Sequence, residues 1–253
     1  MKMSMISAHA THPGIVRKNN EDCIRTDDDL GVYLLADGIG GHNAGEVASA
    51  LAVETVYSIL RSNIERTEID GYFELMVHAM QTAHWEINSK ASTRSSLSRM
   101  GTTLVVALFR EETAYIAHAG DSRCYLYQNA ALPHLKRDSN KLKRLTDDHT
   151  VGFQRLASGV PIEQIPKKYF HTLTQSIGCG NPPTPDFKVV EFNQGDLLLI
   201  CSDGLTDMLS DVEIEAILAC RDTSLDTLAG NLIDHANSNG GRDNISVVLV
   251  TSP

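Results

Sequence analysis

The sequence predicts an α+β protein in which antiparallel sheets pack together and helices cover the outside. Two observations lead to this expectation. Short apolar runs rich in β-branched and aromatic residues recur along the chain, and segments with helical periodicity stand between and beside them. A chain of 253 residues can bury one sizeable core, so we expect a single domain over residues 1–253.

The predicted strands are short apolar runs, most of them bounded by turn residues. They cover residues 32–36, 103–109, 113–118, 123–127, 187–192, 196–201 and 245–250. The runs TTLVVALF and TAYIAHAG are joined by a short polar connection, and AGDSR then leads into CYLYQN. We therefore expect these three runs to form an antiparallel meander.

Four segments show the helical spacing of apolar residues, at 44–61, 72–90, 211–219 and 224–237. In the first of them, Ala48, Ala52 and Val56 fall near one face. The stretch 150–180 breaks the pattern with Gly159, Pro161, Pro166 and a Lys167-Lys168 pair. Its length and character predict a surface flap with one or two helical turns, of the kind that often serves a functional site.

The composition excludes several classes of function. A formal net charge of −10 argues against a nucleic-acid or anionic-membrane partner, because both attract a positive surface. The longest apolar runs are far shorter than the roughly 20 residues that span a bilayer. The first residues also lack the apolar segment of a secretory signal, so the sequence predicts a cytoplasmic protein without a membrane partner.

Aspartates stand at the ends of four predicted strands, at Asp37, Asp121, Asp203 and Asp243. Any one of them could be an ordinary turn or helix-capping residue. Together we expect them to converge on one edge of a sheet, where their carboxylates would repel one another. A hard divalent cation such as Mg²⁺ or Mn²⁺ would remove that repulsion, and the carbonyl of Gly38 could approach it closely.

An arginine precedes a pair of acidic residues in the segment HPGIVRKNNEDCIR. Arg17 could form a plain ion pair with Glu21 or Asp22. Alternatively, its planar guanidinium could hold a phosphate while the acids hold metal-bound water. The residues alone leave both possibilities open.

Eight motifs, taken in order, resemble the type 2C (PPM) family of metal-dependent Ser/Thr protein phosphatases, in its bacterial single-domain form. They are RKNNEDC, ADGIGGHNAGE, MGTTLVVALF, HAGDSRCYLY, LTDDHT, LTQSIG, DLLLICSDGLTDML and GGRDNISVVLV. The series runs from about residue 7 to 251, nearly the whole chain. The resemblance implies a four-layer α-β-β-α sandwich of two antiparallel sheets flanked by helices.

The resemblance also implies a site with two core ions and a third, weaker one, all Mn²⁺ or Mg²⁺. Asp37 would bridge the two core ions, the Gly38 carbonyl would bind one of them, and Asp203 and Asp243 would bind the other. Asp121 would help bind the third ion. The remaining implied roles are water orientation for Glu21 and Asp22, phosphate binding for Arg17, and local structural support for Asn244.

The implied activity is hydrolysis of phosphoserine and phosphothreonine by direct attack of a metal-bridging hydroxide, without a phosphoenzyme. The implied substrate is a phosphorylated protein, such as a Ser/Thr kinase or its targets in bacterial signalling. We expect a monomer. The alternative is a non-catalytic pseudophosphatase that binds phosphoproteins, although such a protein would normally have lost metal-binding carboxylates.

One position departs from the family pattern. Animal members carry a histidine directly after the metal-site Asp-Gly pair, proposed to protonate the leaving alkoxide, and this chain has Ile39 there. His42 is a candidate for that acid, although a histidine in a glycine-rich turn is more often a structural hydrogen-bonding group. A metal-bound water could donate the proton instead.

Overall fold

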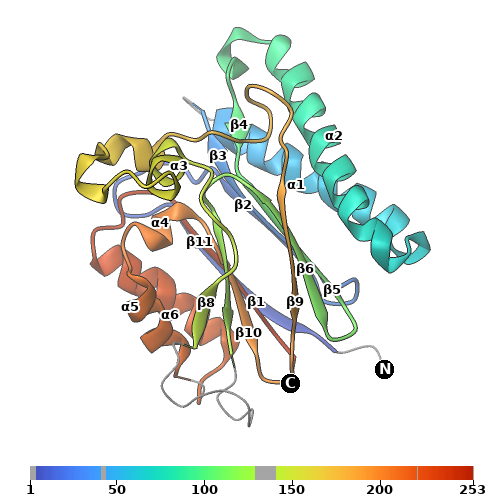
Figure 1. Cartoon of the computed structure of the whole chain (residues 1–253), viewed down its shortest axis with the longest axis vertical. Coiled ribbons are helices and arrows are strands. Elements are labelled where there is room, and N and C mark those ends of the chain that lie inside the picture. Colours follow the sequence, from blue (N-terminus) through green and yellow to red (C-terminus); the bar gives the residue numbers. More distant parts are fainter. Residues whose placement is uncertain (1–3, 41–43, 129–140, 221, 253) are drawn as a thin grey trace.

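Two antiparallel sheets stacked face to face form the centre of the molecule (Figure 1). The computed structural model describes residues 4–40, 44–128, 141–220 and 222–252. The first sheet has the strand order β1 (Ile6–His12), β11 (Ile245–Thr251), β10 (Leu197–Cys201), β7 (Arg123–Tyr127) and β8 (Leu142–Arg144). The second has the order β2 (Asp22–Asp27), β3 (Val32–Ile39), β5 (Leu104–Arg110), β6 (Thr113–Ala119) and β9 (Asp186–Glu191), with the short β4 (Gly101–Thr102) paired to the end of β3.

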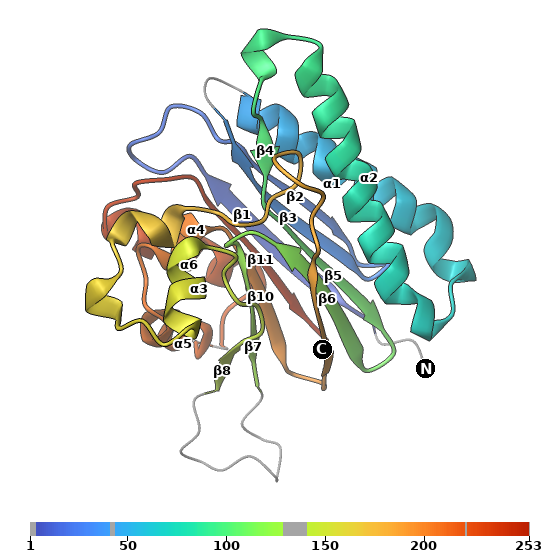
Figure 2. The same ribbon diagram turned by 45° about the horizontal axis from the view of Figure 1, so that its top comes forward.

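Helices cover the outer face of each sheet (Figure 2). The second sheet is covered by α1 (Ala44–Asn63) and α2 (Tyr72–Ser92), and the first by α5 (Asp211–Leu218) and α6 (Leu225–Ser238). Three apolar cores hold these layers together, one under each helix pair and one between the sheets. The four-layer α-β-β-α sandwich predicted from the sequence is therefore confirmed.

Local sequence signals begin the C-terminal helices. The Ser210 side chain accepts a hydrogen bond from the backbone N–H of Glu213, and the Glu213 carboxylate accepts one from the Ser210 N–H. This reciprocal pair satisfies backbone N–H groups that the first turn of α5 would otherwise leave free. Ser224 caps α6 in a similar way through the N–H of Thr227.

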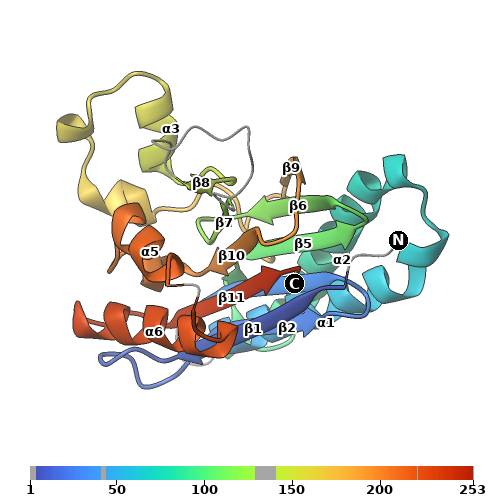
Figure 3. The same cartoon turned by 90° about the horizontal axis from the view of Figure 1, so that it is seen from below.

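Short helices fill the connections near one end of the sandwich. They are α3 (Val151–Ala157), η4 (Ile162–Gln164), η5 (Lys167–His171) and α4 (Asp203–Thr206); η1 (Ile64–Arg66), η2 (Ile69–Gly71) and η3 (Ser95–Leu97) flank α2. The segment from α3 to η5 falls inside the predicted flap 150–180 and projects beyond the sheets (Figure 3). We call residues 150–180 the flap below.

The predicted meander is wrong in its third strand. β5 and β6 do pair as a hairpin, but β7 pairs with β10 and β8 in the other sheet. The turn at Gly120, whose φ is +112°, carries the chain from one sheet to the other. A residue with a side chain rarely adopts such a backbone angle, so the glycine permits this change of direction.

All seven predicted runs are strands and all four predicted helices are present, but the strands β1, β2, β4 and β8 were not predicted. In the part of the chain that the structure describes, no helix combines the length and apolar character needed to cross a membrane. The cytoplasmic location stays a prediction.

Candidate active site

A cleft of about 760 Å³ opens where strand ends of both sheets meet. It gathers most of the residues singled out in the sequence. The lining includes Arg17, Glu21, Asp37, Gly38, Asp121, Asp203, Asp243 and Asn244, together with Ile39, Thr103, His171, Ser176, Cys179 and Asp207.

Asp37 is fixed by its backbone at the end of β3. Its N–H donates to the hydroxyl of Thr103 at 3.0 Å, and its carbonyl accepts from the N–H of Thr103 at 2.9 Å and the hydroxyl of Thr102 at 2.8 Å. Asp22 is its direct partner on the neighbouring strand β2. Two carboxylates thus stand side by side at one end of the second sheet.

The other carboxylates come from different strands. Asp203 follows β10 and begins α4, and Asp243 precedes β11, so both belong to the first sheet. Asp121 lies in the turn that leaves the second sheet after β6. The expectation that the four aspartates share one sheet edge is therefore wrong. The cleft lies between the sheets, and each sheet contributes two of them.

The carboxylates at the floor of the cleft have raised pKa values, because they are buried close to one another. Loss of hydration, followed by repulsion from neighbouring carboxylates, raises the pKa of Asp37 and of Asp203 well above the usual range. Burial likewise raises the pKa of Asp22 and of Asp121 to about 6. A divalent cation among these groups would favour their ionised forms and oppose both effects.

The donor set fits such a cation. One carboxylate oxygen of Asp22 is buried and lacks a hydrogen-bond partner among the described residues, although the other accepts from the Ser202 hydroxyl at 2.9 Å. A side chain at Gly38 would collide with the backbone of Gly45 and Glu21, so the β3 terminus can approach these neighbours only without one. Oxygen ligands of this kind suit Mg²⁺ and Mn²⁺.

Arg17 also lines the cleft. Its guanidinium donates to the Asp243 carboxylate at 2.6 Å, and the arginine side chain is 57% exposed. Asn244 fastens the loop that carries Arg17, because it donates to the carbonyls of Pro13 and Asn19 and accepts from the N–H of Glu21. The phosphate-binding group predicted from the sequence thus sits beside a predicted metal ligand.

Comparison with known proteins identifies this arrangement. A sequence model described as protein phosphatase 2C matches residues 16–234. The chain belongs to the protein phosphatase 2C family. The serine/threonine phosphatase stp of Listeria monocytogenes is 35% identical over 247 residues, which are 95% of this chain and 93% of that protein.

Solved structures agree with this assignment. A serine/threonine phosphatase of S. agalactiae superposes with a TM-score of 0.87 at 32% identity, over 98% of this chain and all of that one. The catalytic domain of the phosphatase PstP, solved with two manganese ions, gives 0.81 at 29% identity over 98% and 97% of the two chains. This chain is accordingly a catalytic Ser/Thr protein phosphatase of a metal-dependent family, and the pseudophosphatase alternative is set aside.

Two residues of this phosphatase cleft were not assigned a place in it from the sequence. Asp207 lies one helical turn after Asp203, and the Nδ1 of His171 in the flap is 3.6 Å from its carboxylate. Ligand atoms of Asp203, Asp207 and His171 all lie within 4.8 Å of one another. The four-residue spacing from Asp203 was the signal that could have pointed to Asp207.

The leaving-group acid has no side chain assigned to it. Ile39 lines the cleft at 36% exposure, and its hydrocarbon side chain cannot transfer a proton. His42, the candidate named from the sequence, lies outside the described residues. Its role stays a prediction.

Proposed function

We propose that this phosphatase hydrolyses phosphoserine and phosphothreonine in proteins with two Mn²⁺ or Mg²⁺ ions held by Asp37, the Gly38 carbonyl, Asp203 and Asp243. One observation carries the proposal: carboxylates from both sheets and the guanidinium of Arg17 share a single cleft. When bound, the ions would supply a deprotonated water as the nucleophile and neutralise charge on the transferring oxygens.

The protein's own residues would bind and orient the substrate around that chemistry. Arg17 would exchange its contact with Asp243 for a bidentate contact with the substrate phosphate, a pairing that the planar guanidinium favours. Glu21 and Asp22 would hold water near the floor of the cleft. Asn244 would keep the Arg17 loop in place through its bonds to Pro13 and Asn19.

A third ion would bind more weakly beside Asp121, with Asp203 shared. The nearby carboxylate of Asp207 and the imidazole of His171 support this assignment, because they add oxygen and nitrogen donors on the flap side of the cleft. A nitrogen donor would favour Mn²⁺ over Mg²⁺ at this position, since Mg²⁺ prefers oxygen.

The substrate would be a phosphoprotein of bacterial signalling, namely a Ser/Thr kinase or its targets, and the enzyme would act as a cytoplasmic monomer. Relatives named as serine/threonine phosphatases support the substrate class. The flap would select among substrates through Lys167 and Lys168, which stand exposed in η5 beside the cleft.

A metal and arginine test addresses the proposal directly. Hydrolysis of p-nitrophenyl phosphate should require Mn²⁺ or Mg²⁺ and stop with EDTA. Arg17→Ala should lower kcat/KM by roughly 100-fold, as expected when a charged contact to the reacting group is lost. Lys18→Ala is the matched control, because Lys18 is the neighbouring residue and is also exposed. We expect its kcat/KM to stay near the wild-type value. Turnover that persists in EDTA, or equal losses in the two variants, would refute the proposed roles.

A further inference from the structure

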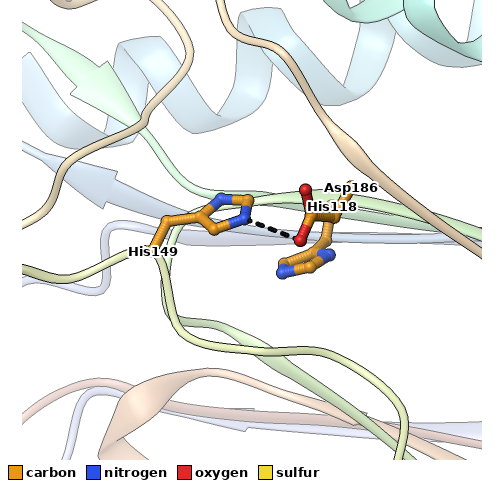
Figure 4. Close-up of side chains that lie close together, drawn as sticks. All are labelled: His118, His149 and Asp186. Carbon is orange, nitrogen blue, oxygen red and sulfur yellow. Dashed lines mark ion pairs between the residues drawn. The ribbon is translucent and has the colours of Figure 1, made fainter. Parts of the chain in front are cut away.

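A second cluster of ionisable side chains lies outside the cleft, between the flap and the sheet edge (Figure 4). His118 and Asp186 are cross-strand partners on β6 and β9. The rings of His118 and His149 stack with centroids 4.5 Å apart and an interplanar angle of 19°. The Nε2 of His149 is 3.4 Å from the Asp186 carboxylate and makes no hydrogen bond to any described residue.

Hydrogen bonding opposes a metal at this cluster. The Nδ1 of His149 accepts the backbone N–H of Gly120 at 3.2 Å, so a neutral His149 carries its proton on Nε2 and has no lone pair there. The Nε2–H of His149 instead faces the carboxylate of Asp186.

His149 connects two parts of the molecule that are far apart in sequence. Its backbone N–H donates to the Gly120 carbonyl at 3.0 Å, so that together with the Nδ1 bond it holds Gly120 at two points. Its own carbonyl accepts from the N–H of Thr174 at 2.8 Å. The next residue, Thr150, caps α3 and bridges to Leu173. His149 therefore joins the flap, at Thr150 and Thr174, to the Gly120 turn.

The Gly120 turn leads directly into the cleft, because the next residue, Asp121, lines it. Gly120 also packs closely against Thr103. The hydroxyl of Thr103 lies 2.7 Å from the hydroxyl of Ser122. Thr103 in turn holds the backbone of Asp37. The turn that carries Asp121 is thus held on the floor side of the cleft by Thr103 and on the flap side by His149.

We propose that His149 is a positioning residue that couples the flap to the ion site at Asp121. Its Nδ1 fixes the turn that aims Asp121, and its backbone fixes the base of the flap that carries His171. An ion bound at Asp121 and the arrangement of the flap therefore depend on each other through this residue. The inference rests on the third-ion role of Asp121 proposed above.

Three substitutions at His149 separate this role from simple packing. His149→Asn keeps a polar atom near the position of Nδ1 that can accept the Gly120 N–H, whereas His149→Gln places its donor near Nε2 and His149→Leu has neither. Isothermal titration calorimetry with Mn²⁺ would measure the tight and weak sites of each folded variant. Melting temperatures in EDTA would report any general loss of packing.

We expect Gln and Leu to weaken the weakest Mn²⁺ site about tenfold, in line with the effect of lost supporting contacts around a metal ligand, and Asn to retain most of the affinity. The tight sites should not change. The KM for a phosphothreonine peptide should rise in the same two variants, with little change for p-nitrophenyl phosphate. Equal weak-site affinity in all three variants would overturn the coupling.

Asp121→Asn distinguishes failure of the coupling from failure of the third-ion proposal. We expect Asp121→Asn to lose the weak Mn²⁺ site. If Asp121→Asn still binds Mn²⁺ at the weak site, both proposals are overturned. If Asp121→Asn loses the weak site but His149→Gln retains it, only the coupling is overturned.

Asp186→Ala provides a second test if the variants at buried positions fail to fold, because Asp186 is exposed. We expect its weak-site affinity to fall about threefold, because the Nε2–H of His149 loses the carboxylate that it faces at a partly exposed position, and an unchanged affinity would count against the coupling.

Discussion

The floor of the cleft and the flap are built in opposite ways. The floor consists of strand termini whose backbones are fixed by both sheets, and its carboxylates stay close together although their pKa values are raised. The flap consists of short helical segments with exposed side chains, closed at its base by the Thr150–Leu173 bridge. The difference suggests that the chemistry depends on rigid placement, whereas substrate choice rests on a part that can vary without disturbing the cores.

Removing one carboxylate from the floor should give the largest effect. Asp37→Asn should lower kcat for p-nitrophenyl phosphate by a factor on the order of 10³, because the bridging ligand is lost along with the charge that both ions require. The fold should remain, and in EDTA the variant should melt no lower than wild type, since a repelling charge has gone.

Asp207→Asn is the matched comparison from the same cleft, because Asp207 stands beside the proposed third, weaker ion and is assigned no core ion. We expect it to retain most of the activity with p-nitrophenyl phosphate. Equal losses of activity in Asp37→Asn and Asp207→Asn would mean that activity depends on the total negative charge of the cleft and not on the position of Asp37.

The strained floor should also make the metal-free protein sensitive to pH. Folding raises the pKa of Asp22 and Asp121 from the ordinary 3.8 to about 6, so the folded state binds protons more tightly than the unfolded state. Stability in EDTA should then be greatest below about pH 4 as far as these groups are concerned, and should fall as pH rises through 6. The size of the effect is about 1.4 kcal/mol per pKa unit.

Saturating Mn²⁺ should remove much of this loss, because the ions favour the ionised carboxylates. Thermal unfolding between pH 5 and 8 would measure the loss of stability in EDTA and its reduction by Mn²⁺. A melting temperature in EDTA that rises over this range would contradict the assignment of these carboxylates to a strained, metal-binding floor.

Sequence patterns predicted the floor well because its parts are strongly marked. An apolar run followed by Asp and Gly predicts both a buried strand and the position where it ends, as at Asp37 and Asp203. Three of the four edge strands, β1, β2 and β8, were missed for the opposite reason. In β1 only Ala8 is buried, and Ile6 is 44% exposed, so the segment carries no apolar run. Its pairing with β11 is a tertiary contact that local pattern does not encode.

Local sequence patterns also could not predict which strands belong to which sheet. The turn at Gly120 resembles a hairpin in sequence, yet it transfers the chain between the sheets, and this placed the aspartates on opposite sides of the cleft. His171 and Asp207 are 36 positions apart in sequence, and their proximity depends on how the flap folds back. Such contacts follow from topology, which short motifs do not determine.

The flap should respond more gently to substitution than the floor. Replacing Lys167 and Lys168 together by Ala should lower kcat/KM about threefold to tenfold for phosphopeptides with acidic neighbours, because exposed charges act weakly across solvent. Hydrolysis of p-nitrophenyl phosphate should not change, and the peptide effect should fade at high salt. Lys90→Ala, on the outer helix α2, is the control for loss of a positive charge elsewhere. If the double variant lost activity equally toward both substrates, the lysines would be acting on the reaction centre, and the separation of floor from flap would fail.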